Sequence, residues 1–342
     1  MARVAPGFGF TVSDSAFWGG ARRLKDTHPT LCDKTAKMVN PPCDGLKNMV
    51  TYPVDWVDAF TDSAFGGNGC AVVHDNGAMS DADCIAFTRE TSLVECTFIG
   101  PSDRADVKVC YFMASGQIPF AGHPTIASVG SLIPRGLIAG PNMTIESGAG
   151  VIDIQIDTGA DGTWIEMTQI APTFGPKIDK AEVAQAVGLK PEDIASQPQV
   201  VSTGLPFCIT VVSDPDVLRQ NARVTPALDP FADRHAIPDV DRVFPYLVTL
   251  SGATAAGSTF ARLLLTPPLP AEDAFTGSAT GATAAYLWHH GLIDSPTYIA
   301  EQGHGMGRPG QARVQVLGLP NAISGVKVAG QAHILMSGDL RL

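Results

Sequence analysis

Two glycine-containing stretches constrain the fold of this 342-residue chain more than any other feature. The first covers residues 117–125 (QIPFAGHPT) and the second covers residues 271–280 (AEDAFTGSAT). Each places small residues and a polar side chain where an extended segment is predicted to turn into an apolar helix. Helix N-termini attract anions because their first N–H groups lack partners within the helix. Two such turns that face each other would form a site for a small anion.

The first of these helices is expected to begin with His123 at the N-cap and Pro124 at the first helical position, where a missing N–H does no harm. Residues 125–133 continue it with small and apolar side chains, which suit burial inside a sheet or barrel. In the second stretch, Ser278 is expected to cap a helix over residues 279–290. Both helices are therefore predicted to lie in the core.

The rest of the first part of the chain shows strand signals and one side helix. Strands are predicted at residues 50–60, 70–73, 96–99, 106–112 and 151–168, the last as a hairpin. Ser80 and Asp83 form a capping box that opens a helix expected to reach Glu90.

The second part repeats this plan. Gly188 closes a predicted helix over residues 180–187, and a further helix is predicted over residues 215–228. Strands are predicted at residues 199–202, 207–212, 244–248, 261–265, 313–316, 325–328 and 332–335. Because no residue-by-residue repeat links the two parts, the predicted duplication is one of architecture.

Residues 1–48 differ from the remainder, since they hold seven Lys or Arg and four Asp in a chain whose net charge is -11. They contain few aliphatic residues and little periodicity, so we expect a poorly ordered N-terminal extension that ends near Met49. Residues 49–170 are expected to form an N-terminal lobe and residues 171–342 a C-terminal lobe. The last strand is free to return to the N-terminal lobe.

The net charge, the length of the apolar runs and the cysteine content argue against several classes of protein. A net charge of -11 without a basic stripe argues against nucleic acid as a partner. The sequence contains no run of 18 apolar residues, which argues against a membrane span. Seven cysteines without a CxxC pair do not suggest a disulfide framework, so we expect a cytoplasmic protein.

Glu95 is the clearest candidate for chemistry. It follows Leu93 and Val94 and precedes Cys96, which is an apolar setting for an acid. Desolvation there would raise the pKa of the carboxyl group, as a general acid or base that works near neutral pH requires. The alternative is that Glu95 points to solvent from an edge strand.

Four further polar residues each have two interpretations. His123 contacts a substrate or is a satisfied structural histidine, and Asp273 faces a cleft or forms a solvated pair with Glu272. Ser278 is fully explained as a helix cap, although the backbone N–H groups beside it can bind a carboxylate. Asn68 either forms a glycine-rich turn or supplies a polar group to a site.

A glycine-rich turn and a pair of histidines are weaker candidates for a functional site. Residues 66–69 (GGNG) follow a strand but lack the GxGxxG spacing of a dinucleotide site. His289 and His290 fall in the last turn of a predicted helix, where no third ligand is in register for a metal. The pattern therefore gives no reason to expect a dinucleotide or a metal.

Six motifs follow one another in a characteristic order. They are VDAFTDSAFGGNGCAVV (57–73), RETSLVECTFIG (89–100), QIPFAGHPTIAS (117–128), VVSTGLPF (200–207), EDAFTGSATGA (272–282) and EQGHGMGRPG (301–310). In this combination the chain resembles the phenazine-biosynthesis isomerase-like (PhzF-like) family, relatives of diaminopimelate epimerase. The resemblance covers residues from about 50 to 342 and leaves out the first 48.

The resemblance implies an α+β fold of two pseudo-symmetric lobes, each a curled, mostly antiparallel sheet or barrel around a central helix. The active site is expected between the lobes and the protein is expected to be a homodimer. The implied activity is cofactor-independent proton transfer in a small carboxylated metabolite. The positions expected to act on the proton are Glu95, Asp273 and His123, and those expected to bind the substrate are Asn68, Gly122, Gly277 and Ser278.

The chain also departs from the family pattern close to these positions. The family usually has Pro where this chain has Gly69 and Ala274, commonly Ser where it has Val94, and often Glu where it has Gln117. Changed neighbours around unchanged acids suggest that the chemistry is kept and the substrate differs.

The epimerase relatives carry two catalytic cysteines at the starts of the central helices, where this chain has Ala121 and Thr276. A two-thiol racemase mechanism is therefore disfavoured. The leading prediction is an isomerase that relocates a proton and a double bond, with Glu95 as base and then acid. The alternatives are epimerisation of an amino or hydroxy acid, and a non-catalytic binding protein on the same fold.

Overall fold

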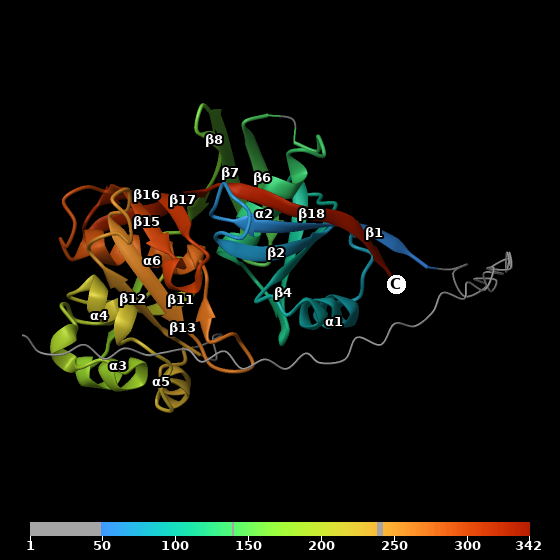
Figure 1. Cartoon of the computed structure of the whole chain (residues 1–342). Coiled ribbons are helices and arrows are strands. Elements are labelled where there is room, and N and C mark those ends of the chain that lie inside the picture. Colours follow the sequence, from blue (N-terminus) through green and yellow to red (C-terminus); the bar gives the residue numbers. More distant parts are fainter. Residues whose placement is uncertain (1–48, 139, 238–241) are drawn as a thin grey trace, which may run out of the picture. The chain divides into compact units, whose positions relative to one another are not determined.

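A computed structural model of the chain describes residues 49–138, 140–237 and 242–342. All of the described residues belong to one compact unit, residues 49–342. The expected N-terminal extension lies outside the described residues. Within the described residues, six α-helices and eighteen strands are present, which confirms the mixed α+β class (Figure 1).

We call residues 49–170 the first half and residues 171–342 the second half. The strands of the first half are β1 (Thr51–Ala59), β2 (Asn68–Val73), β3 (Cys96–Gly100), β4 (Val107–Met113), β5 (Gly116–Ile118), β6 (Asn142–Ser147), β7 (Gly150–Gly159) and β8 (Gly162–Gln169). Those of the second half are β9 (Thr173–Lys177), β10 (Gln199–Ser202), β11 (Pro206–Val211), β12 (Pro245–Thr249), β13 (Thr259–Leu264), β14 (Glu272–Asp273), β15 (Thr297–Gln302), β16 (Gly310–Leu319), β17 (Ala322–Gly330) and β18 (Ala332–Arg341). The α-helices are α1 (Asp81–Thr91), α2 (Gly122–Leu132), α3 (Lys180–Val187), α4 (Pro215–Gln220), α5 (Leu228–Arg234) and α6 (Gly277–His289), and short 3₁₀ turns are η2 (Pro191–Asp193) and η3 (His304–Met306).

The strands pair in the same pattern in both halves. The first half is joined in the order β18–β1–β2–β3–β4–β6–β7–β8, and the second in the order β9–β10–β11–β12–β13–β15–β16–β17. The pairs β2–β3, β4–β6, β11–β12 and β13–β15 are parallel, and the other pairings are antiparallel. Strand β8 pairs with β17 where the halves meet, and the last strand returns to lie beside β1 (Figure 1). The division into two lobes remains our interpretation of this order.

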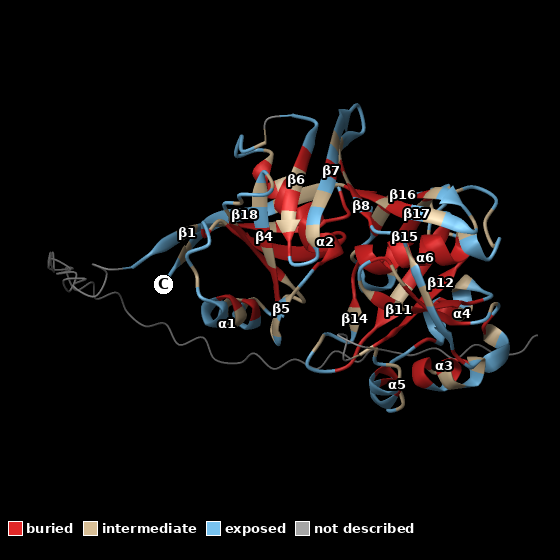
Figure 2. Ribbon diagram, turned by 180° about the vertical axis from the view of Figure 1, so that it is seen from behind, coloured by how far each residue is buried: buried red, intermediate tan, exposed pale blue. Residues whose placement is uncertain are grey.

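One apolar helix fills the interior of each half. Helix α2 packs against β1, β2 and β18, and α6 packs against β11, β16 and β17. Almost every residue of α2 and the first eleven residues of α6 are buried, as Figure 2 shows. Small side chains let the strands approach both helices closely. Of the helices that the structure describes, none has the length and apolar character needed to cross a membrane.

Several local predictions are confirmed. Ser80 caps α1: its Oγ accepts a hydrogen bond from the Asp83 N–H at 3.3 Å and donates to Asp83 Oδ2 at 2.6 Å. Gly188 ends α3 in the left-handed region, at a φ of 72°. Strands β7 and β8 form the expected hairpin.

The single helix predicted over residues 215–228 is wrong. Only its first six residues form a helix, α4, which Asn221 ends, and the next helix, α5, begins at Leu228. Arg262 Nη1 donates to the carbonyl oxygens of Leu218 and Ala222, each at 2.9 Å, and so satisfies carbonyl groups at the end of α4. Arg262 lies on β13, far along the chain, so no local pattern could reveal this stop.

Candidate active site

Four of the predicted site residues meet where the two halves join. Asn68 Nδ2 lies 2.7 Å from Asp273 Oδ1 and 3.2 Å from His123 Nδ1. His123 Nδ1 lies in turn 3.6 Å from Glu95 Oε2. The structure therefore brings Glu95, His123, Asn68 and Asp273 together as a polar cluster, which we call the site cluster.

Strand direction explains why residues so distant in sequence converge. Strands β2 and β3 are parallel, with Ala71 opposite Cys96, so the beginnings of both strands lie at one edge of the sheet. Asn68 is the first residue of β2, and Glu95 immediately precedes β3. The turn into α2 brings His123 to the same edge, and the turn from β14 into α6 brings Asp273 from the second half.

The starts of the two central helices touch. A Cβ atom placed on Gly122 would lie 2.7 Å from the Ser278 backbone nitrogen and 2.9 Å from Gly277 Cα, too close for any side chain. Glycine is therefore required at position 122 by this contact. An anion bound by these helix starts has to lie beside the contact, because the space directly between them is filled.

The predicted helix caps are wrong by two residues in both helices. The N-cap of α2 is Ala121 and that of α6 is Thr276, so His123 and Ser278 are each the second residue of their helix. Neither cap residue bonds its own helix through its side chain; Thr276 Oγ1 donates instead to Asp273 Oδ2 at 2.5 Å. The side chains of His123 and Ser278 are thus released from a capping role.

Burial raises the pKa of Glu95 to about 8, and the negative charge of Asp273 adds to this effect. The Glu95 side chain is 13% exposed. Among the described residues, it receives no hydrogen bond that would stabilise its charged form. Glu95 is therefore an acid whose proton can be lost or gained near neutral pH.

His123 is buried and neutral. Burial lowers the pKa of its imidazole to about 3; the backbone of Gly69 opposes this shift, and the positive charge of Arg308 adds to it. The contact between His123 and Glu95 is thus not an ion pair. Within the described residues, His123 Nε2 has no hydrogen-bond partner, which makes it available to a ligand.

Asp273 has more hydrogen-bond partners than Glu95. Burial raises the pKa of Asp273 to about 6, while hydrogen bonds from Thr276 and Asn68 limit the rise. Between about pH 6 and pH 8, the site cluster therefore holds an ionised Asp273, a protonated Glu95 and a neutral His123. Two carboxyl groups with pKa values pushed apart can divide acid and base roles.

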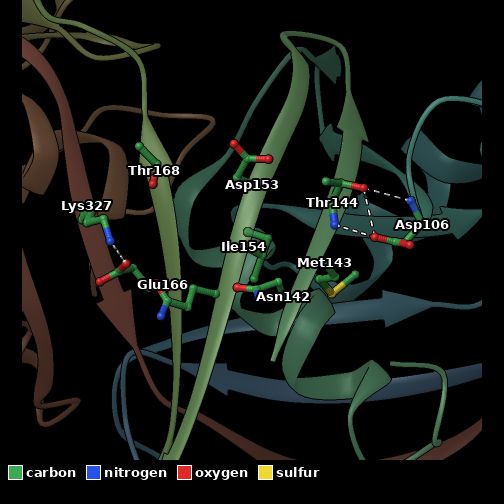
Figure 3. Close-up of a pocket in the computed structure, with 10 residues that line it drawn as sticks. Asp106, Asn142, Met143, Thr144, Asp153, Ile154, Glu166, Thr168 and Lys327 are labelled. Atoms are coloured by element: carbon green, nitrogen blue, oxygen red, sulfur yellow. Dashed lines mark hydrogen bonds and ion pairs between the residues drawn. The ribbon is translucent and has the colours of Figure 1, made fainter. Parts of the chain in front are cut away.

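The cavity drawn in Figure 3 lies elsewhere. It has a volume of about 390 Å³ and opens on the face of strands β6, β7, β8 and β17. Its main charged groups already have partners: Lys327 Nζ lies 2.6 Å from Glu166 Oε1, and Asp106 Oδ2 accepts from Thr144. We place the candidate active site at the site cluster, because perturbed pKa values and unpartnered polar groups mark reactive sites better than volume does.

No group of three or more His, Cys, Asp and Glu side chains within the described ranges is placed to hold a metal ion. The chemistry available at the site cluster is therefore that of two carboxyl groups, one imidazole, one amide and the first N–H groups of α2 and α6. These groups can move protons and bind a carboxylate.

Sequence reasoning gave no role to Thr276 or to Gln302. Thr276 Oγ1 donates to the Asp273 carboxylate, and Gln302 Nε2 donates to the Asp273 backbone oxygen at 2.9 Å. The sequence signal for Gln302 is its place in the motif EQGHGMGRPG (301–310).

The model of the family described as "Phenazine biosynthesis-like protein" (PhzC-PhzF) matches residues 57–338 of this chain. The chain belongs to this family. Its members include several relatives that are named as isomerases. The "Uncharacterized isomerase YfhB" of Bacillus subtilis is 25% identical over 264 residues, covering 76% of this chain and 88% of the relative. The "Trans-2,3-dihydro-3-hydroxyanthranilate isomerase" of Pseudomonas aeruginosa is 28% identical over 292 residues, covering 82% of this chain and 96% of the relative.

Solved structures agree with this assignment. A PhzF-family protein of Bacillus anthracis superposes with a TM-score of 0.73 at 25% identity, covering 85% of this chain and 99% of the other. A hydroxyproline epimerase from Agrobacterium vitis superposes with a TM-score of 0.54 at 12% identity, covering 85% and 93%, which shows a shared fold. The phenazine biosynthesis-like chain thus shares its fold with this epimerase.

Proposed function

We propose that this phenazine biosynthesis-like protein is an isomerase that moves a proton, and with it a double bond, within a small carboxylated metabolite. Glu95 is the proton carrier, and no cofactor takes part. The observation that carries the proposal is the state of Glu95, which is shielded from water, lies 3.6 Å from a neutral His123 and has a pKa raised to about 8. The names of the relatives as isomerases support the same class of reaction.

The reaction proceeds in two proton transfers. The Glu95 carboxylate first takes a proton from one carbon of the substrate, and the electron pair of that C–H bond forms a new double bond. The old double bond shifts its electrons to another carbon, which then receives the proton back from Glu95. Atoms and electrons balance within the substrate, so the enzyme ends in its starting state.

The other groups of the site cluster bind and orient the substrate in this proposal. Its carboxylate lies beside the contact of Gly122 and Gly277, where N–H groups of α2 and α6 and the Ser278 side chain reach it. Asn68 Nδ2 lies 3.2 Å from His123 Nδ1, and in the tautomer that this proposal requires Nδ1 is the acceptor while Nε2 carries the proton and donates a hydrogen bond to the substrate. Asp273 holds Asn68, and its negative charge helps to keep the proton on Glu95 by raising the pKa of that carboxyl group.

The pKa of Glu95 predicts how the rate depends on pH. Below about pH 8 most Glu95 is protonated and cannot act as the first base, so kcat/KM is expected to rise about tenfold per pH unit and to level above pH 8. A midpoint near 4.5 would show that the base has the pKa of an ordinary carboxyl group and would contradict the raised pKa of Glu95.

Deuterium incorporation tests the proposal. The protein is incubated in deuterated water with trans-2,3-dihydro-3-hydroxyanthranilate and a panel of small unsaturated and hydroxylated carboxylic acids, and the labelled carbon is located by NMR. The proposed isomerase labels the carbon that receives the proton. Label on a carbon whose configuration inverts would show an epimerase, and ligand-induced thermal stabilisation without turnover would favour a binding protein.

The E95Q variant supplies the residue-specific test. It is expected to reduce turnover by about 10²–10⁴-fold, the usual contribution of a general acid or base. The matched control is E90Q, which makes the same substitution at an exposed position on α1 and is expected to leave turnover unchanged. Unchanged turnover in E95Q would overturn the mechanism.

A further inference from the structure

The turn between β15 and β16, residues 302–310, touches both sides of the site cluster. It contains η3 and most of the motif EQGHGMGRPG, for which the proposed mechanism has no use. We call it the bracket turn. Its first residue, Gln302, contacts the Asp273 side of the site cluster, and Arg308 contacts the Asn68 side.

Gln302 is fully buried and uses both ends of its amide on the turn that leads into α6. Nε2 donates to the Asp273 backbone oxygen at 2.9 Å and to Thr276 Oγ1 at 3.2 Å. Oε1 accepts from the Thr276 N–H at 3.0 Å and from the Tyr246 hydroxyl at 2.8 Å. Since Thr276 in turn donates to the Asp273 carboxylate, Gln302 fixes the orientation of that carboxylate.

Arg308 makes the corresponding contacts in the first half. Its Nη2 donates to Asp58 Oδ1 at 2.7 Å and to the Gly66 carbonyl at 2.9 Å, while Nε donates to the Gly67 carbonyl at 2.9 Å. The other oxygen of the buried Asp58 accepts from the Phe65 N–H at 2.8 Å. The planar guanidinium group thus holds the chain immediately before Asn68.

The bracket turn also packs tightly against the turn that precedes Asn68 and the turn that follows Asp273. The Gly67 N–H donates to the Pro309 carbonyl at 3.0 Å. Gly303 has a φ of +83°, and a Cβ atom there would lie 2.3 Å from the Arg308 carbonyl oxygen and 2.5 Å from that of Ala274. Gly303 is therefore required by close contact with the turn that carries Asp273.

We propose that Gln302 and Arg308 are positioning residues, and that the bracket turn sets the Asn68–Asp273 and Asn68–His123 distances across the two halves of the site cluster. The catalytic consequence rests on the proposed function, whereas the geometric claim does not. Asn68 Nδ2 reaches Asp273, His123 and the Phe275 carbonyl at once, so a small shift of either turn would break part of this arrangement.

NMR of the full chain tests the geometric claim without a substrate. The side-chain amide signals of Asn68, assigned by their loss in N68S, report its bond to Asp273, and the ring signals of His123 report its titration. The charged groups near that ring are Glu95, Asp273 and Arg308, and all three are followed over the same pH range. Wild-type His123 is expected to stay neutral across the range in which the protein is folded.

Two variants of Arg308 separate geometry from charge. In R308K the positive charge stays but the planar three-bond contact is lost, so the Asn68 amide signals are expected to shift and broaden while His123 stays neutral. In R308M the charge is lost as well, and the midpoint of His123 is expected to rise. The matched control is R313M, which removes an arginine that pairs with Asp161 on the surface and is expected to change neither signal.

Unchanged Asn68 signals in a folded R308K protein would overturn the proposal, even if R308M failed to fold. Where wild type turns over a substrate, R308K is expected to lower kcat by up to about 10²-fold with KM nearly unchanged. If the Asn68 signals shift in R308K but wild type turns over no substrate, the proposed function is wrong and the positioning role stands. If turnover depends on Glu95 but not on Arg308, the positioning role is wrong and the proposed function stands.

Discussion

Two carboxyl groups of the first half, Asp55 and Glu95, are both shielded from water but have opposite properties. Asp55 is 1% exposed and accepts hydrogen bonds from Arg135 Nε at 2.8 Å, Arg135 Nη2 at 2.9 Å, Ser131 Oγ at 2.5 Å and Ser337 Oγ at 2.6 Å. Burial alone would raise its pKa, but these bonds and the charge of Arg135 lower the pKa of Asp55 to about 2. We call this group the Asp55 cluster.

Glu95 lacks such donors, and burial raises its pKa to about 8. The difference shows that burial does not decide what a carboxyl group does; the number of donors around it does. The Asp55 cluster ties β1, the chain after α2 and β18 together with a permanent charge. The site cluster keeps Glu95 ready to exchange a proton.

The largest contrast is expected in turnover. E95Q should lose about 10²–10⁴-fold in kcat, whereas folded D55N should stay within a few-fold of wild type, because Asp55 touches no group of the site cluster. Steady-state kinetics on the substrate identified by deuterium labelling provides the measurement. Equal losses in both variants would remove the distinction between the clusters.

The second contrast concerns the free energy of unfolding, to which Asp55 is expected to make a favourable contribution. D55N should lower the free energy of unfolding by about 3 kcal/mol at pH 7, because the buried Asp55 loses the charge that Arg135, Ser131 and Ser337 stabilise by hydrogen bonds. Urea denaturation monitored by fluorescence gives this value. An S295A protein, which loses only the two exposed hydrogen bonds between the Ser295 hydroxyl and the Thr297 backbone, is the control and should match wild type.

E95Q should change stability in the opposite direction. A native pKa near 8 against a usual 4.5 means that the folded protein holds a proton that the unfolded chain has released, so wild-type stability falls as pH rises from 4.5 to 8. The stability advantage of E95Q over wild type should therefore grow by about 2 kcal/mol between pH 6 and pH 8. A gap that stays constant with pH would contradict the assigned pKa.

The smallest expected effect is a change in the free energy of unfolding at acidic pH. The lowered pKa of Asp55 gives stability that is present above its usual pKa of 3.8 and is lost as pH falls toward 2. The stability gap between wild type and D55N should narrow by about 1 kcal/mol between pH 5 and pH 3. Widening of the gap over this range would show that Asp55 is not held as a charged group.

Local signals in the sequence predicted much of the fold. Caps such as Ser80 and Gly188 and the hairpin of β7 and β8 depend on residues a few positions apart, so a linear reading finds them. The helix starts were misplaced because Gly122 is required by its contact with Ser278, more than 150 residues away. A local rule treats such a glycine as a break before the helix.

The residues of the site cluster were named from the sequence, but the partners that tune them were not. The apolar neighbours of Glu95 indicated a raised pKa, while the network that holds Asp273 through Thr276 and Gln302 depends on folding. The Asp55 cluster left no sequence signal at all, since its donors come from residues 131, 135 and 337. Long-range donors decide which buried charges are fixed, and they appear only in the structure.

The most direct test of this account is the titration of Glu95 itself. Carbon-13 NMR of glutamate side-chain carboxyl groups, with Glu95 assigned by its absence in E95Q, gives the pKa without any substrate. We expect a midpoint near pH 8, far from the other glutamates. A midpoint near 4.5 would mean that Glu95 is an ordinary ionised carboxylate at neutral pH, and the central claim, that burial without hydrogen-bond donors keeps Glu95 ready to exchange a proton near neutral pH, would be contradicted.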